Sequence, residues 1–199
     1  MSARDEMLSR IRGALADRPM PAPVTRNYRS AGTAPGDVAV FAARVEDYRA
    51  AVHERTTVDA VLAGRGIGRI VVPDGFPDAW LPSVDSEVEL VREPVDVATL
   101  DAVSAVVTTC AIAVAETGTI VLDHGPGQGP RALTLVPDYH LAVVRHDQVV
   151  AGVPDAVAAL DPSRPLTWIS GPSATSDIEL NRVEGVHGPR TLDVLLIAD

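Results

Sequence analysis

The sequence contains no lysine, because all 17 of its basic residues are arginine. This absence excludes a lysine Schiff base, a pyridoxal-phosphate anchor and the phosphate-binding lysine of a P-loop. The only cysteine is Cys110. One cysteine excludes an internal disulfide and an iron–sulfur cluster held by four thiolates of this chain. In its apolar setting we expect Cys110 to be unreactive.

The sequence also lacks a long hydrophobic run. Its hydrophobic content is 46%, yet no apolar stretch approaches the ~18 residues of a membrane span. The first residues carry charges and no apolar core of a signal peptide. We therefore expect a cytoplasmic protein without a membrane segment.

Negative charge exceeds positive charge, with a formal net charge of −10. This argues against nonspecific nucleic-acid binding. The charge is uneven, because residues 1–30 hold six arginines against three acids and the remainder holds 11 arginines against 24 acids. The amino-terminal arm and the body thus differ in electrostatic character.

An amphipathic helix is predicted over residues 3–16, followed by a proline-rich linker over residues 19–36. Apolar side chains recur there at helical spacing; they are Met7, Leu8, Ile11 and Leu15. A helix this short is marginal alone in water, so it is expected to pack on its own body, a second copy or a partner. We divide the chain into an arm, residues 1–36, and a domain, residues 37–199.

Short apolar strands alternate with helical patterns before residue 105 and again after residue 152. Helices or helical turns are predicted at 37–50, 57–63, 77–81, 97–103 and 153–160. Strands are predicted at 51–55, 69–72, 88–91, 166–169 and 192–197. This alternation indicates an α/β domain with a largely parallel sheet. The Gly64-Arg65-Gly66-Ile67-Gly68 segment follows a helix and precedes a strand, so it is interpreted as a helix end and not as a dinucleotide turn.

Five apolar segments without an intervening helix predict a meander of strands between residues 105 and 144. They are 105–107, 112–115, 119–122, 132–136 and 140–144.

Residues 170–190 are the most polar stretch between apolar strands. Gly171 and Pro172 end a strand, and Ser176-x-x-Glu179 fits a capping box that begins a helix. A strand, a small-residue loop and a helix start favour anion binding through free backbone N–H groups. The candidate ligand-binding residues here are Ser173, Thr175, Ser176 and Arg190, and His187 is a candidate catalytic residue in a loop.

Glu116-Thr117-Gly118 lies between two apolar strands, where a carboxylate beside glycine can approach a ligand. The segment is similar to the Glu-Asn-Gly segment that carries the nucleophilic glutamate of CoA-transferases, although Thr117 replaces the asparagine. We treat Glu116 as a candidate catalytic residue and Thr117 and Gly118 as ligand-binding. The alternative is a turn whose glutamate is solvated or pairs with an arginine.

The glycine-rich loop 123–131 ends in Arg131, which can pair bidentately with a carboxylate or phosphate. A flexible hairpin connection is the alternative. His140 begins an apolar strand and is either a ligand-binding or a structural histidine. No histidine spacing typical of a metal site is present, so no metal is predicted.

Three blocks of this sequence resemble the LUD domain family, in its lactate-utilisation protein C branch. They are residues 115–122, residues 133–140 and residues 170–190. The resemblance covers the chain from about residue 41 onward. It implies a three-layer fold similar to the NagB/RpiA/CoA-transferase group.

The resemblance also implies a function: the cluster-free subunit of a bacterial system that oxidises L-lactate to pyruvate. Iron–sulfur clusters would then reside on partner proteins, with no cofactor in this chain, and the body would bind a small anion or an organic cofactor at the carboxyl ends of the strands. The alternatives are a stand-alone enzyme acting on an acyl or phosphorylated substrate, and a non-catalytic scaffold or regulator. Self-association into a homo-oligomer is a further expectation.

Overall fold

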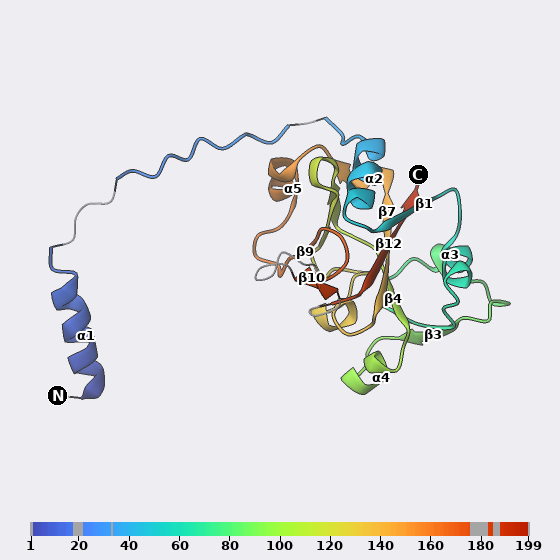
Figure 1. Cartoon of the computed structure of the whole chain (residues 1–199), viewed down its shortest axis with the longest axis horizontal. Coiled ribbons are helices and arrows are strands. Elements are labelled where there is room, and N and C mark those ends of the chain that lie inside the picture. The colour runs from blue at the N-terminus through green and yellow to red at the C-terminus, as the bar shows by residue number, and fades with distance from the viewer. Residues whose placement is uncertain (1, 18–21, 33, 176–182, 185–187, 199) are drawn as a thin grey trace.

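A six-stranded sheet forms the centre of the body (Figure 1). The computed structural model of the chain describes residues 2–17, 22–32, 34–175, 183–184 and 188–198. The strands of the sheet are, in spatial order, β1 (Ala51–Glu54), β12 (Thr191–Ile197), β7 (Tyr139–Arg145), β4 (Ala105–Thr108), β2 (Arg69–Val72) and β3 (Glu89–Arg92). All neighbouring pairs are parallel, which confirms the α/β class and the largely parallel sheet.

Helices cover the central sheet because its strands are apolar on both faces. The α-helices are α1 (Ala3–Ala14), α2 (Val38–Asp47), α3 (Val58–Gly64), α4 (Val97–Asp101) and α5 (Val153–Ala159). On one face, Val61 and Leu62 of α3 pack in a cluster with Leu141 and Leu195. A side-chain cap begins four of these helices, at Ser2, Asp37, Thr57 and Asp96, and satisfies N–H groups that the first turn leaves free.

A second, smaller sheet lies against the other face, with strands in the order β8-β5-β6-β9. Its strands are β8 (Val149–Val150), β5 (Ile112–Val114), β6 (Thr119–Leu122) and β9 (Thr167–Ile169). The predicted meander is therefore wrong. β4 and β7 are parallel neighbours in the large sheet, whereas β5 and β6 form an antiparallel hairpin in the small one. The strands of both sheets are buried, so their sequences are similarly apolar and do not show to which sheet each strand belongs.

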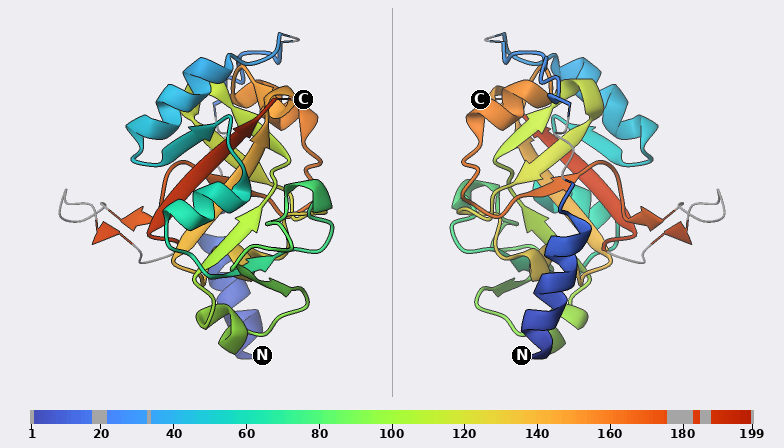
Figure 2. Two further views of the ribbon diagram at one scale, coloured as in Figure 1. Left: turned by 90° about the vertical axis from the view of Figure 1, so that its right-hand side faces the viewer. Right: turned by 90° about the vertical axis from the view of Figure 1, so that its left-hand side faces the viewer.

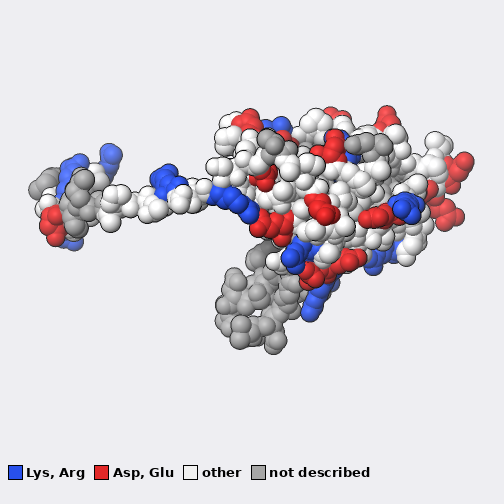
Figure 3. Space-filling view, turned by 90° about the horizontal axis from the view of Figure 1, so that it is seen from above, with Lys and Arg blue, Asp and Glu red and all other residues white. Residues whose placement is uncertain are grey.

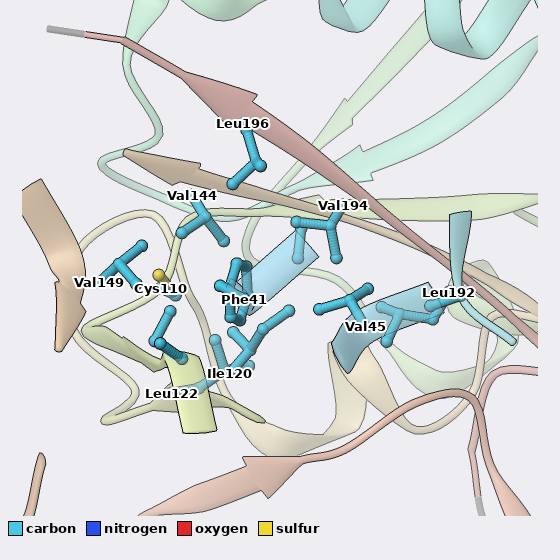
Figure 4. Close-up of a cluster of buried hydrophobic side chains, with 14 residues drawn as sticks. Phe41, Val45, Cys110, Ile120, Leu122, Val144, Val149, Leu192, Val194 and Leu196 are labelled. Carbon is cyan, nitrogen blue, oxygen red and sulfur yellow. The ribbon is translucent and has the colours of Figure 1, made fainter. Parts of the chain in front are cut away.

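The main core fills the space between the two sheets and α2 (Figure 4). Phe41 and Val45 of α2 point into it, and the same cluster contains Ile120 of the small sheet and Val194 of the large one. Cys110 lies in the same cluster at 3% exposure, and burial raises the pKa of its thiol to about 12. The thiol is therefore protonated at neutral pH.

The predicted strand over residues 132–136 is instead a 3-10 helix, η3 (Arg131–Thr134). Leu133 and Thr134 are buried there. An apolar, buried segment is typical of a strand, which is why the sequence predicted one although the backbone is helical. The other 3-10 helices are η1 (Asp78–Trp80), η2 (Ala115–Thr117) and η4 (His146–Gln148). Short segments of this kind give no periodic signal.

The helix predicted from Ser176 lies mostly outside the described residues. At its described ends, β10 (Ala174–Thr175) pairs antiparallel with β11 (Val183–Glu184). The helix prediction is therefore wrong at Val183 and Glu184. Serine and threonine near a glycine favour turns and extended backbone as readily as a helix cap.

Helix α1 confirms the predicted amino-terminal helix and lies away from the body (Figure 1); in the two views of Figure 2, which look along the arm, it overlaps the body in projection. No described residue of it is buried; the side chains of Met7 and Ile11 are 64% and 49% exposed. An extended segment leads to the body, where Gly36 donates to the Val149 carbonyl at 2.8 Å. Figure 3 shows acidic side chains spread over one face of the body and arginines along this segment.

Candidate functional site

A cavity of about 240 Å³ opens where the amino-terminal ends of β7 and β12 face β9 of the small sheet. Its lining combines an arginine, a buried histidine, several hydroxyl groups and an indole. These residues include Arg131, Thr134, His140, Trp168, Ser170 and Ser173. We call it the Arg131 cavity. Three residues predicted from sequence thus meet there, at the amino ends of the strands and not at the carboxyl ends where a pocket was expected.

Arg131 begins η3 after the glycine-rich loop, and its side chain is held by that short helix. Its Nη1 donates to the carbonyl oxygen of Thr134 at 2.8 Å and to the Thr134 hydroxyl at 3.0 Å. Within the described part of the chain, its Nε and Nη2 atoms have no hydrogen-bond partner. These two groups form the fork that guanidinium uses to bind a carboxylate or phosphate.

His140 also borders this cavity and is only 1% exposed. Its Nε2 lies 2.8 Å from the hydroxyl oxygen of Thr108 at the end of β4. Burial lowers the pKa of His140 to about 3, and the charge of Arg131 acts in the same direction. At neutral pH the ring is therefore uncharged and serves as a hydrogen-bonding group, not as a second cation.

A chain of hydroxyl groups connects the Glu116-Thr117-Gly118 segment to the cavity. The Thr117 hydroxyl lies 2.7 Å from that of Thr119, which lies 2.8 Å from that of Ser170 in the cavity lining. Thr117 itself does not line the cavity. It can act there only by orienting the Ser170 hydroxyl.

The polar loop of residues 170–190 contributes Ser173 to the cavity. The Ser173 amide donates to the Pro189 carbonyl at 2.9 Å, which holds the two ends of the loop together. Ser176 and His187 lie outside the described residues, and so does the side chain of Thr175. Their predicted roles stay predictions.

Glu116 lies elsewhere, on the exposed side of η2. Its carboxylate accepts hydrogen bonds from both terminal nitrogens of Arg29 in the arm. This hydrogen bonding and the arginine charge lower the pKa of Glu116. The pairing corresponds to the alternative interpretation of this residue, a turn glutamate bound to an arginine.

Two further predicted residues also lie outside the cavity. Gly118 adopts a left-handed conformation, with φ at +60°, and lies against the backbone of α2. Arg190 is exposed, and its Nε is 3.6 Å from a carboxylate oxygen of Asp138. The structure therefore groups Arg131, His140 and Ser173 and separates them from Glu116, Gly118 and Arg190.

Comparison with known proteins connects this architecture to a family. The LUD domain model matches residues 87–197, which include the strands and loops around the Arg131 cavity. The chain belongs to the LUD domain family. This confirms the family resemblance found in the sequence.

Two relatives of this LUD domain protein carry the same name. Lactate utilization protein C of Deinococcus radiodurans is 44% identical over 98% of this chain and 95% of its own length. A protein of the same name from Bacillus pumilus is 41% identical over 43% of this chain and 38% of its own length. The crystal structure of a DUF162 family protein from Deinococcus radiodurans aligns with a TM-score of 0.65 and 39% identity, over 81% of this chain and 96% of that one.

Sequence reasoning missed a buried polar cluster on the opposite face of the large sheet. Asp193 in β12 is fully buried and accepts hydrogen bonds from Arg65 at 2.8 and 2.9 Å and from the Tyr139 hydroxyl at 2.8 Å. His53 Nε2 lies 2.9 Å from the same carboxylate. The sequence feature that could have revealed this cluster is Asp193 itself, a carboxylate inside the apolar run of residues 192–197. A buried charge requires partners, so such a residue indicates a polar cluster around it.

Among the residues that the structure describes, no three His, Cys, Asp or Glu side chains are grouped to hold a metal ion. In the same residues, no helix is long and apolar enough to cross a membrane.

Acidification is expected to destabilise the fold through His140. The unfolded histidine titrates near 6.5 and the folded one near 3, so the unfolded state binds the extra proton between these values. The stabilisation is complete above pH 6.5 and is lost as the pH falls, by up to about 1.4 kcal/mol per pH unit. Urea unfolding of the wild type at pH 7 and pH 5 should show about 2 kcal/mol of loss from this residue.

The matched variant is His140→Gln, which keeps a hydrogen-bonding side chain for Thr108 but does not titrate. Its loss of stability between the two pH values should be smaller than that of the wild type by the same amount. Equal losses in the two proteins would contradict a neutral, buried His140.

Proposed function

We propose that this protein takes part in bacterial L-lactate utilisation and binds a small carboxylate in the Arg131 cavity. The single observation that carries the proposal is the position of Arg131, with two donors of its guanidinium facing no protein acceptor in the described residues. The 44% identity to a protein named for lactate utilisation supports the choice of pathway.

The cavity has the groups that a 2-hydroxy or 2-oxo acid requires. Arg131 would pair with the carboxylate, and the Ser170 hydroxyl, which also contacts that of Thr119, borders the cavity near the oxygen on the second carbon; Ser173 lines the same cavity. The neutral ring of His140 would contribute a hydrogen bond without competing for the negative charge. A volume of about 240 Å³ suits a ligand of a few heavy atoms.

Electron transfer would take place on partner proteins in this proposal. The only cysteine is buried in the core, and its thiol is protonated at neutral pH. The chain would therefore act as the cluster-free subunit beside iron–sulfur proteins. The finer fold assignment, to the NagB/RpiA/CoA-transferase group, and the division into residues 1–36 and 37–199 are part of the same proposal.

Replacing Arg131 with glutamine is expected to weaken lactate or pyruvate binding about 10- to 100-fold. The reason is the loss of charge-assisted hydrogen bonds worth about 1.5–3 kcal/mol. Calorimetric titration of the purified chain measures the affinity. Arg190→Gln is the control, because Arg190 is exposed near Asp138 and does not line the cavity. Equal effects of the two substitutions would contradict the assignment of the carboxylate to Arg131.

The purified chain is expected to show no visible absorption from an iron–sulfur cluster or a flavin and no lactate oxidation by itself. Oxidation should require the partner proteins, isolated by pulldown of the native complex, and should fall in a complex carrying Arg131→Gln. Lactate oxidation by the isolated chain would instead favour a stand-alone enzyme. Full oxidation by the partners without this chain would favour a scaffold or regulator.

A further inference from the structure

A larger cavity, of about 670 Å³, opens at the opposite edge of the central sheet. It lies at the carboxyl ends of three neighbouring strands, next to Glu54 of β1, Ile197 of β12 and His146 after β7. In open α/β sheets this edge is where ligands commonly bind, and the volume is in the range of small-molecule sites. The cavity shares no lining residue with the Arg131 cavity.

One wall of this cavity is apolar and contains a tryptophan. Trp80 and Leu81 line it together with Ile197. The indole of Trp80 is held edge-to-face by Phe76, with ring centroids 6.2 Å apart and an interplanar angle of 76°. A partly exposed indole, fixed in position beside aliphatic side chains, favours a flat ring as its ligand.

The rim carries polar side chains that have no hydrogen-bond or ion-pair partner among the described residues. Within the described ranges, the side chains of Glu54, Arg55 and His146 form neither a hydrogen bond nor an ion pair, whereas Asp59 already accepts from Ser86 at 2.6 Å. Arg55 adopts a left-handed backbone conformation, with φ at +54°. A non-glycine residue in this region costs free energy, and such residues cluster at ligand sites as well as occurring in turns.

We propose that this cavity binds a nucleoside monophosphate. The base would lie against Trp80, and the ribose hydroxyls would donate to Glu54, since a carboxylate at a strand end suits a diol. The phosphate would pair with Arg55 and accept a hydrogen bond from His146. The proposal depends on a ring wall, an acceptor and a cation that border one cavity at the carboxyl edge of the sheet, and it is independent of the proposed role of the Arg131 cavity.

The two tryptophans allow a direct test, because Trp80 lines this cavity and Trp168 lines the other. In the full-length Trp168→Phe variant, Trp80 is the only tryptophan. Adding AMP should quench its fluorescence in a saturable way. Adenosine should bind more weakly, and inorganic phosphate alone should cause no quenching. Calorimetry on the wild type provides a second measurement of the AMP affinity.

Arg55→Gly removes the guanidinium while glycine accepts the left-handed backbone without strain. It should weaken AMP binding about tenfold or more without lowering the melting temperature. Arg49→Gly is the matched control, because Arg49 is also an arginine with positive φ, at +66°, and does not line the cavity. The proposal is overturned if AMP gives no saturable quenching and no calorimetric binding, or if Arg49→Gly weakens binding as much as Arg55→Gly.

Discussion

Replacing Asp193 with alanine is expected to lower the free energy of unfolding by about 3–5 kcal/mol, the range measured when one partner of a buried ion pair is removed. The carboxylate is completely buried and is the common acceptor for Arg65 and Tyr139. Its loss leaves the buried Tyr139 hydroxyl without this partner, and a buried polar group without a partner lowers the stability by about 1–3 kcal/mol. Because the Arg65 side chain is 41% exposed, water can replace part of its lost interaction, which favours the lower end of the range.

Urea unfolding at neutral pH measures this loss, and Asp138→Ala provides the control. Asp138 also faces an arginine, but its side chain is 71% exposed and the pair is 3.6 Å apart. Exposed pairs of this kind contribute about 0–1 kcal/mol. A loss below about 1 kcal/mol for Asp193→Ala would mean that the cluster does not stabilise the fold.

Substituting alanine for Gly118 is expected to cost about 2–5 kcal/mol, through left-handed strain and overpacking. A Cβ atom there would lie 2.7 Å from the carbonyl carbon of Arg44 and 2.8 Å from the amide nitrogen of Val45. Both atoms belong to the backbone of α2, so the helix would have to move away from η2. The free energy of unfolding from urea titration is again the measurement.

Gly66→Ala separates the two contributions to this cost. Gly66 has a similar φ, +68°, but no atom lies within 4 Å of the position that a Cβ atom would take there. Its substitution should show only the backbone strain, about 1–2 kcal/mol. If both glycines gave the same loss, contact between Gly118 and α2 would not explain the requirement for glycine.

The secondary structure was largely predictable where local signals were strong. The helical patterns that begin at Asp37 and Thr57 and the apolar runs of β2 and β12 predicted correct elements. The assignment of strands to sheets was not predictable, because β5 and β7 have the same apolar character and lie in different sheets. Pairing is decided by long-range packing, which sequence periodicity does not contain.

The candidate site was predictable only in part, because residue type can be read from the sequence and long-range placement cannot. Arg131, His140 and Ser173 were selected by residue type, and the fold brings them to one cavity. Glu116 was selected in the same way, but its partner Arg29 lies 87 residues earlier in the sequence. No local pattern predicts a contact over that distance, so the pairing became visible only in the structure.

The position of β12 between β1 and β7 has a consequence for synthesis on the ribosome. Among the described residues, strand β1 pairs with β12 alone, and His53 and Asp193 on these strands are 140 residues apart in the sequence. Until β12 is translated, a nascent chain therefore exposes the free edges of both β1 and β7. Contacts of such high sequence separation slow folding, and open strand edges favour intermolecular pairing. Newly made chains should therefore depend on chaperone protection until residues 191–197 have left the ribosome.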